Sequence, residues 1–182
     1  MEQFRVAILK KKPLDSRLKE RMYKHFWGYL MGVAMRYVGD KEAACEVVND
    51  SFMKLFKHAE RFECPELPSE FEAAFRVWMA RITAHTALNT LRKRRILFVY
   101  SEDLTYYEQP GPAEDRLEVE DFIRMLDRLP SLHRAVFSLY EIEGYTHEEI
   151  SQLLGIPAGT SRGYLSKAKE RLRTLYSRLH LK

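Results

Sequence analysis

Glycine and proline are scarce in this chain of 182 residues, which has eight glycines and seven prolines. They concentrate at points where a helix would end, and alternating runs of β-branched residues are nearly absent. The sequence therefore argues against a sheet-rich fold and predicts an almost entirely helical protein. A hydrophobic fraction of 46% argues against a disordered chain, and the length suits one or two domains.

Cysteine and long apolar runs are also scarce. Cys45 and Cys64 are too few and too far apart for a zinc motif, so we interpret them as reduced structural thiols. No stretch approaches the ~20 apolar residues that a membrane span needs. The apolar run at residues 6–9 is too short for a signal-peptide core. We therefore expect a cytoplasmic protein without membrane insertion.

Motifs that would indicate catalysis are missing. The sequence contains no glycine-rich phosphate loop and no nucleophile elbow, and its six histidines form no metal-spaced pair. The carboxylates lie in charge-rich helices, and nothing around them indicates a raised pKa. We expect a protein that is not an enzyme and that needs neither a cofactor nor a metal.

Charge is unevenly distributed along the chain. The net charge is only +4, with a pI of about 9.0. Basic clusters at residues 10–12, 92–95 and 167–173 nevertheless alternate with an acidic stretch after residue 100. Any one cluster can be a solvated surface, but their segregation indicates nucleic acid as a partner.

Hydrophobic periodicity predicts three long helices in the first half of the chain. The first follows a cap at Asp15 or Ser16, the second begins near Lys41, and the third covers residues 70–95. Between the last two, Cys64-Pro65 and Leu67-Pro68 predict a loop over residues 61–69. Further along, Pro110-Gly111-Pro112 predicts a break in an acidic linker. The predicted organisation is an N-terminal tail (1–13), a first domain (14–96), an acidic linker (97–118) and a second domain (119–182).

Residues 144–173 carry the strongest local pattern. Thr146 and Glu149 have the spacing of a capping box, Gly155 suits a helix end with positive φ, and Pro157 suits a helix start. The helix that follows has apolar residues on one face and basic residues on the other. This pattern predicts a helix-turn-helix whose second helix can enter a DNA major groove.

Two further surfaces are candidates for binding. The third helix places Arg81, His85, Asn89 and Arg92 on one polar stripe that leads into Lys93, and this pattern suits a nucleic-acid backbone. Beside it, the aromatic residues Phe62, Phe71 and Phe75 suit stacking on an unpaired base. A plain amphipathic helix with an aromatic hinge is an equal alternative.

The second helix carries Glu46, Asn49 and Asp50 outside its apolar stripe. Such a patch is usually solvated surface, and its alternative use is to dock a basic partner.

Taken together, these motifs resemble a sigma factor of the sigma-70 family, in its extracytoplasmic-function class. Residues 39–56 resemble the family's core-polymerase-binding helix, with Asn49 and Phe56 where Gln and Trp are usual. Residues 75–82 and 91–94 resemble its promoter-melting helix and the basic end of that helix. Residues 156–169 resemble its −35 recognition helix, with Gly163 and Tyr164 in place of Ser and Arg.

The resemblance implies an all-α fold of two small helical domains, sigma-2-like and sigma-4-like, joined by an acidic flexible linker. It implies binding to core RNA polymerase through its beta-prime and beta subunits, recognition of promoter DNA, and an anti-sigma factor as a further partner. The implied core-binding residues are Glu46, Asn49, Asp50 and Met53. Those implied at the −10 element are Phe71, Arg76, Arg81, His85, Asn89, Arg92 and Lys93. Those implied at the −35 element are Thr160, Arg162, Gly163, Ser166, Lys167 and Lys169.

Two other functions stay open from the sequence. One is a free-standing helix-turn-helix regulator that acts without polymerase. The other is a protein that keeps the fold but titrates a partner. The first would normally dimerise on a palindromic site, and this chain has no obvious dimerisation heptad.

Overall fold

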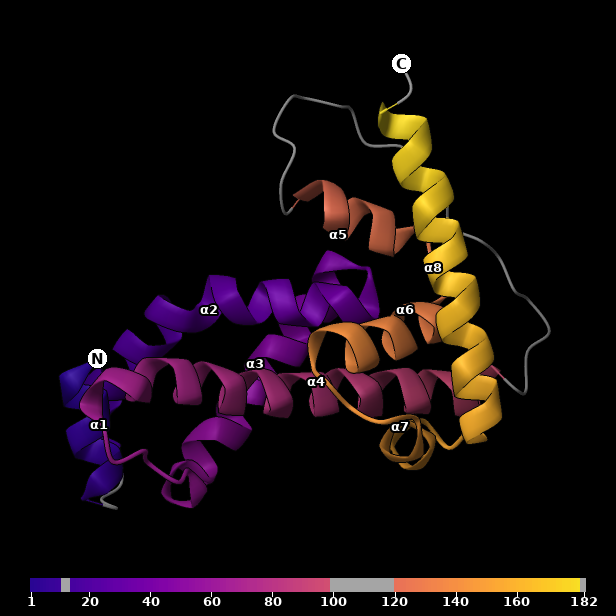
Figure 1. The fold of residues 1–182 in the computed structure, drawn as a ribbon. Helices are drawn as coiled ribbons and strands as arrows, with labels where there is room; N and C mark the ends of the chain where they lie inside the picture. Colours follow the sequence, from indigo (N-terminus) through magenta and orange to yellow (C-terminus); the bar gives the residue numbers. More distant parts are fainter. Residues whose placement is uncertain (11–13, 99–119, 181–182) are drawn as a thin grey trace. The chain divides into compact units, whose positions relative to one another are not determined.

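The computed structural model describes residues 1–10, 14–98 and 120–180, and side chains within residues 1–10, 14–92 and 122–178. The predicted linker lies almost wholly outside these described residues. In the described parts every regular element is helical (Figure 1). Their bounds are α1 Glu2–Leu9, α2 Ser16–Val38, α3 Lys41–Lys57, η1 Ala59–Arg61, η2 Pro68–Glu70, α4 Phe71–Phe98, α5 Glu120–Asp127, α6 Ser131–Phe137, the π-helical turn η3 Ser138–Ile142, α7 His147–Leu154 and α8 Ala158–His180.

The chain forms two compact units. The first comprises Met1–Met35 and Asp40–Ala87, and the second comprises Arg36–Gly39 and Leu88–Lys182. Helices α2 and α4 each continue past the limits of the first unit. The domain boundaries predicted from the sequence, at residues 14, 96 and 119, stay a prediction.

The helix starts in the first unit follow from capping side chains. Asp15 Oδ1 accepts a hydrogen bond of 2.7 Å from the Leu18 amide at the start of α2. Asp40 Oδ2 accepts one of 2.8 Å from the Ala43 amide at the start of α3. Each carboxylate satisfies a first-turn N–H that has no partner within its helix. The three long helices predicted from periodicity are confirmed.

Aromatic side chains form the core of the first unit. The Phe75 ring, fully buried, lies 5.7 Å from Phe26 of α2, 5.3 Å from Phe71 and 5.1 Å from Phe62. Trp78 stacks on Phe75 at 5.7 Å. Phe62 lies in the segment between η1 and η2, so these rings fasten that segment to α2 and α4. Aromatic pairs of this kind add to the stabilisation from burial alone.

Helix α1 was not expected, because the sequence analysis treated residues 1–13 as a tail. Phe4 and Ile8 are buried, the Phe4 ring lies 6.2 Å from Phe26, and α1 packs against η1. Phe4 and Ile8 therefore extend the aromatic core, whereas Leu9 at the end of the helix faces solvent. Periodicity over so few residues gives little signal, which is why the helix was missed.

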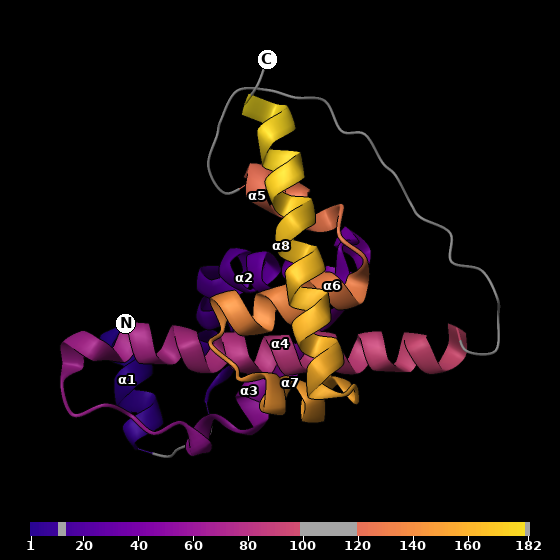
Figure 2. The ribbon, with the colours of Figure 1, turned by 45° about the vertical axis from the view of Figure 1, so that its right-hand side comes forward.

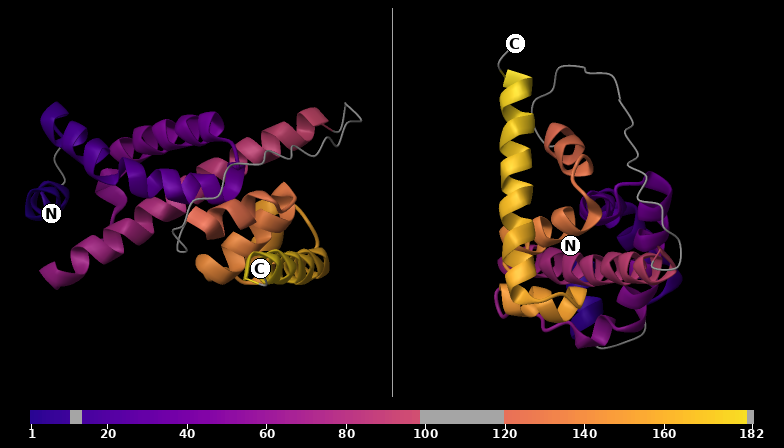
Figure 3. Two further views of the ribbon diagram at one scale, coloured as in Figure 1. Left: turned by 90° about the horizontal axis from the view of Figure 1, so that it is seen from above. Right: turned by 90° about the vertical axis from the view of Figure 1, so that its right-hand side faces the viewer.

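The second unit is organised along α8, against which α5, α6 and α7 pack (Figure 3). Leu126 and Leu129 near the end of α5 meet Ala168 and Leu172 of α8 in a buried cluster, with Phe122, Met125 and Phe137 at its edge. Arg171 Nε of α8 also donates to the Arg128 carbonyl at 3.2 Å. These contacts fix α8 so that its opposite face stays exposed.

Both cysteines, Cys45 and Cys64, are free and partly buried. Among the described helices, none combines the length and the apolar character that crossing a bilayer requires.

Candidate nucleic-acid interface

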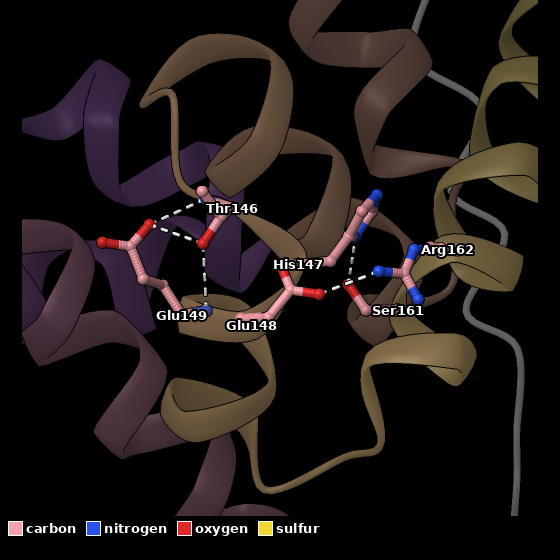
Figure 4. Close-up of polar contacts among 6 residues, drawn as sticks. All are labelled: Thr146, His147, Glu148, Glu149, Ser161 and Arg162. Atoms are coloured by element: carbon pink, nitrogen blue, oxygen red, sulfur yellow. Dashed lines mark hydrogen bonds and ion pairs between the residues drawn. The ribbon is translucent and has the colours of Figure 1, made fainter.

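The helix-turn-helix begins with a complete capping box at α7 (Figure 4). The Glu149 amide donates to Thr146 Oγ1 at 3.2 Å, and the Thr146 amide donates to Glu149 Oε2 at 2.8 Å. At the other end of α7, Gly155 adopts φ +63° and its amide bonds the Ser151 carbonyl. A residue with a Cβ would be strained there. The capping box and the turn predicted from the sequence are confirmed.

Helix α8 begins directly after the turn and lies against α7 (Figure 2). Ile156 is buried in the turn, and Leu165 and Leu172 are buried along the inner face of α8. The leucines of this face are therefore used in packing within the second unit. The opposite face is the one available to a partner.

All the residues predicted for the −35 contact lie on α8. Arg162, Gly163, Ser166 and Lys167 are exposed, whereas Thr160 and Lys169 are partly buried. Space around Gly163 is open where a Cβ would project. The exposed face of α8 is thus cationic, and no side chain projects from it at Gly163.

Two ion pairs link the cations of α8 to preceding elements. Arg162 Nη2 lies 2.8 Å from Glu148 Oε1 of α7, and Lys169 Nζ lies 2.7 Å from Glu141 Oε1 of η3. Sequence reasoning missed both pairs because their members are far apart in the chain. Nothing in the local pattern distinguishes these glutamates from other surface carboxylates.

His147 differs from its sequence interpretation as a simple surface residue. The ring is partly buried and stacks on Tyr140 with centroids 4.5 Å apart. Its Nδ1 lies 2.9 Å from Oγ of Ser161, which is fully buried (Figure 4). His147 is therefore a structural link between α7 and α8.

His133 of α6 lies beside the basic face of α8, with its ring 4.7 Å from Tyr164. Burial, together with the charges of Lys167 and Arg171, lowers the pKa of His133. A lowered pKa favours the neutral imidazole at neutral pH. The positive charge of this face therefore comes from lysine and arginine.

The polar stripe predicted on α4 is confirmed as an exposed surface. Arg81, His85, Asn89 and Arg92 are all exposed, while the side chain of Lys93 lies outside the described residues. The ring of His85 is exposed only in part, and this partial desolvation, followed by the charges of Arg81 and Lys54, lowers the pKa of His85. His85 therefore offers the stripe hydrogen-bonding capacity more than charge.

Two residues predicted for the −10 contact, Phe71 and Arg76, lie on α4 but outside its exposed polar stripe. Phe71 is only 1% exposed because its ring belongs to the aromatic core, so it offers no surface for stacking on a base. The prediction that Phe71 contacts a base is therefore corrected. Phe71 instead packs against Phe62 and so supports the segment between η1 and η2. Arg76 is partly buried, pairs with Glu72 at 2.9 Å and lies over the Tyr29 ring at 5.0 Å. Its guanidinium is engaged within the first unit.

The patch predicted on α3 is exposed as a whole. Glu46, Asn49 and Asp50 face solvent, and Met53 is 71% exposed, which is unusual for a large apolar side chain. Tyr23 of α2, missed by sequence reasoning, donates from its hydroxyl to Asn49 Oδ1 at 2.9 Å. This bond orients the amide so that its NH₂ group faces away from Tyr23.

In the parts of the chain that the structure describes, no three His, Cys, Asp or Glu side chains gather as a metal site would require. The arrangement instead combines a helix-turn-helix with a cationic outer face, a second helix with an exposed polar stripe, and a separate acidic patch. This combination is typical of a DNA-binding protein.

Comparison with known protein families agrees with this class. Residues 22–96 match the model of "Sigma-70 region 2", and residues 120–172 match that of "Sigma-70, region 4". Together the two matches cover most of the chain. The chain therefore belongs to the sigma-70 family, and its function is that of an RNA polymerase sigma factor.

Individual relatives carry the same description. The chain is 26% identical over 170 residues to RNA polymerase sigma-H factor of Pseudomonas aeruginosa, covering 86% of this chain and 84% of the relative. It is equally identical, over 170 residues, to ECF RNA polymerase sigma-E factor of Haemophilus influenzae, with 86% of each covered. Neither relative supports a free-standing regulator.

A solved structure shows the same fold. It is the sigma factor RpoE of Bartonella quintana, in complex with the anti-sigma factor NepR. The TM-score is 0.54 at 21% sequence identity, covering 87% of this chain and 96% of that chain.

Proposed function

We propose that this sigma factor divides promoter recognition and polymerase docking among three surfaces. The exposed face of α8 binds the −35 element, the polar stripe of α4 binds the −10 element, and the α3 patch binds core RNA polymerase. The observation that carries the proposal is the exposed cationic face of α8, which a helix-turn-helix presents to the major groove.

The −35 contact follows from the chemistry of the α8 side chains. Arg162 can bond guanine through O6 and N7, and Lys167 can grip phosphate. Thr160, Ser166 and Lys169 lie on the same helix, where hydroxyl and ammonium groups suit phosphate oxygens. The open space at Gly163 lets the helix backbone approach the groove closely.

The −10 contact requires a base to leave the stack. Unpairing costs a few kcal/mol, which the protein offsets by holding the extruded base. Arg81, Asn89 and Arg92 supply donors for the backbone, and His85 supplies a neutral hydrogen-bonding group. The segment from 61 to 70, fastened by Phe62 to the aromatic core, borders this helix.

The α3 patch is the proposed binding surface for core polymerase. Glu46 and Asp50 would pair with basic groups of the beta-prime subunit, and the oriented Asn49 amide would donate to an acceptor between them. Met53 supplies an exposed apolar contact of the adaptable kind common at binding surfaces. The beta subunit is the second core partner that we propose.

Nucleotide chemistry belongs to the core enzyme in this account, and this chain supplies recognition. An anti-sigma factor is a further proposed partner, and the cytoplasm is the proposed location, where polymerase and promoter DNA are found.

Reversal of one charge tests the docking surface. We expect Asp50→Lys to weaken binding to sigma-free core polymerase by about tenfold or more, because juxtaposed like charges cost several kcal/mol. Asp50 is exposed, so the helical circular dichroism of the variant should match that of the original chain. Affinity is measured by titrating labelled protein with core.

Glu2→Lys is the control, because it makes the same charge change on a different helix, α1. It should leave the affinity for core unchanged. Unchanged affinity of Asp50→Lys, or an equal loss in both variants, would refute docking through α3.

A further inference from the structure

Two consecutive residues of α7 hold two consecutive residues of α8. His147 bonds Ser161, and Glu148 pairs with Arg162 (Figure 4). The first pair is shielded, since Ser161 is fully buried and His147 stacks on Tyr140. The second lies at the surface, with side chains 66% exposed for Glu148 and 58% for Arg162.

The shielded pair fixes the backbone from which Arg162 projects. A hydroxyl–imidazole bond of 2.9 Å joins the first turns of α7 and α8 one residue before Arg162. Movement of the arginine is therefore confined largely to its own side chain. That side chain has many rotamers, and a long cation is costly to order.

Glu148 selects among those rotamers. Its Oε1 accepts one N–H of Nη2 at 2.8 Å, which leaves four of the five N–H donors of the guanidinium, among them two neighbouring donors on the edge that faces away from Glu148. A guanine presents two acceptors, O6 and N7, in the major groove, and two donors in one plane can bind both. A guanidinium whose plane is set in advance loses less freedom when it meets that base.

The same carboxylate disfavours the competing use of the arginine. Phosphates bind guanidinium groups without regard to base sequence. A negative charge beside Arg162 repels a phosphate that approaches the same nitrogen more strongly than it repels the uncharged edge of a base, because the phosphate carries a full negative charge. Glu148 therefore acts against unspecific binding.

We propose that Glu148 is a specificity-determining positioning residue, which holds Arg162 in the orientation that reads a guanine edge within the −35 element. This inference rests on the proposed role of Arg162 in −35 recognition. The pair is too exposed to contribute much to stability, so its effect should be seen in base preference.

The test uses holoenzyme reconstituted from the full chain and core polymerase, with a library of promoter fragments randomised across the −35 element. Sequencing of bound fragments gives the base preference at each position. The position read by Arg162 is the one at which Arg162→Ala removes the preference. For Glu148→Gln we expect the preference there to fall about threefold or more, the lower range of couplings between contacting residues. Binding to fragments without the element should rise.

Two variants separate positioning from charge. Glu148→Asp keeps the charge but shortens the reach by one methylene, so it should reduce the same preference without raising unspecific binding. Glu141→Gln removes the same charge beside Lys169, so it should raise unspecific binding without altering that preference. In an Arg162→Ala background, Glu148→Gln should change the preference at that position no further.

The outcomes are distinct. A Glu148→Gln holoenzyme with the original base preference would overturn the positioning role. So would equal flattening by Glu148→Gln and Glu141→Gln, because net charge would then explain both. If Arg162→Ala flattens no position at all, the proposed −35 contact itself fails, and this inference fails with it.

Discussion

Replacement of Arg162 by alanine should reduce transcription from a −35-dependent promoter about 5- to 150-fold. This corresponds to the ~1–3 kcal/mol that an arginine bidentate to guanine contributes. Arg162 is exposed on α8 and its pair with Glu148 is a surface pair, so the fold should be unaffected. The measurement is the yield of transcripts from reconstituted holoenzyme at fixed, stated salt.

Arg173→Ala is the matched control, since it removes the same group from the exposed face of the same helix. It lies 11 residues further along, or roughly 16 Å at 1.5 Å per residue. This variant should keep most of the original transcript yield. The small loss of yield should be the same for all promoter sequences. Unchanged transcription with Arg162→Ala would remove this residue from the −35 contact.

Replacement of Phe75 by alanine should lower the free energy of unfolding of the first unit by about 3–5 kcal/mol. The ring is fully buried and contacts Phe26, Phe62, Phe71 and Trp78. Its removal leaves a cavity that several neighbouring rings cannot fill together. Since small proteins are stable by only about 5–15 kcal/mol, this change is a large part of the total.

Both tryptophans of the chain, Trp27 and Trp78, lie in the first unit. Urea unfolding followed by tryptophan fluorescence therefore reports on this unit, and the shift in midpoint gives the loss of stability. Val77→Ala is the control, because Val77 is an exposed neighbour whose truncation should cost less than about 0.5 kcal/mol. Similar midpoints for the two variants would contradict an aromatic core centred on Phe75.

Features set by residues close in sequence could be predicted from the sequence. The capping box joins Thr146 to Glu149, which is only three residues further along the chain. Gly155 acts through its own φ angle. The polar stripe of α4 follows from helical periodicity alone, and its exposure is as predicted. Local geometry of this kind leaves few alternatives.

Features set by contacts between distant residues could not be predicted. Phe71 suits a stacking surface by sequence, but packing on Phe62 and Phe75 buries it. The pairing of Glu148 with Arg162, and of Tyr23 with Asn49, depends on which helices meet and in which register. Periodicity predicts which face of a helix is apolar. It does not predict which other helices that face or its edges will contact.

The central claim, that this chain is an initiation factor that reads promoters through α4 and α8, is tested most directly by transcription in vitro. The protein is mixed with sigma-free bacterial core polymerase and a library of promoter fragments, and transcript starts are mapped. We expect discrete starts that require the protein and share a −35 and a −10 element upstream. Binding to core without any protein-dependent start, on a library transcribed by a control sigma factor, would contradict it.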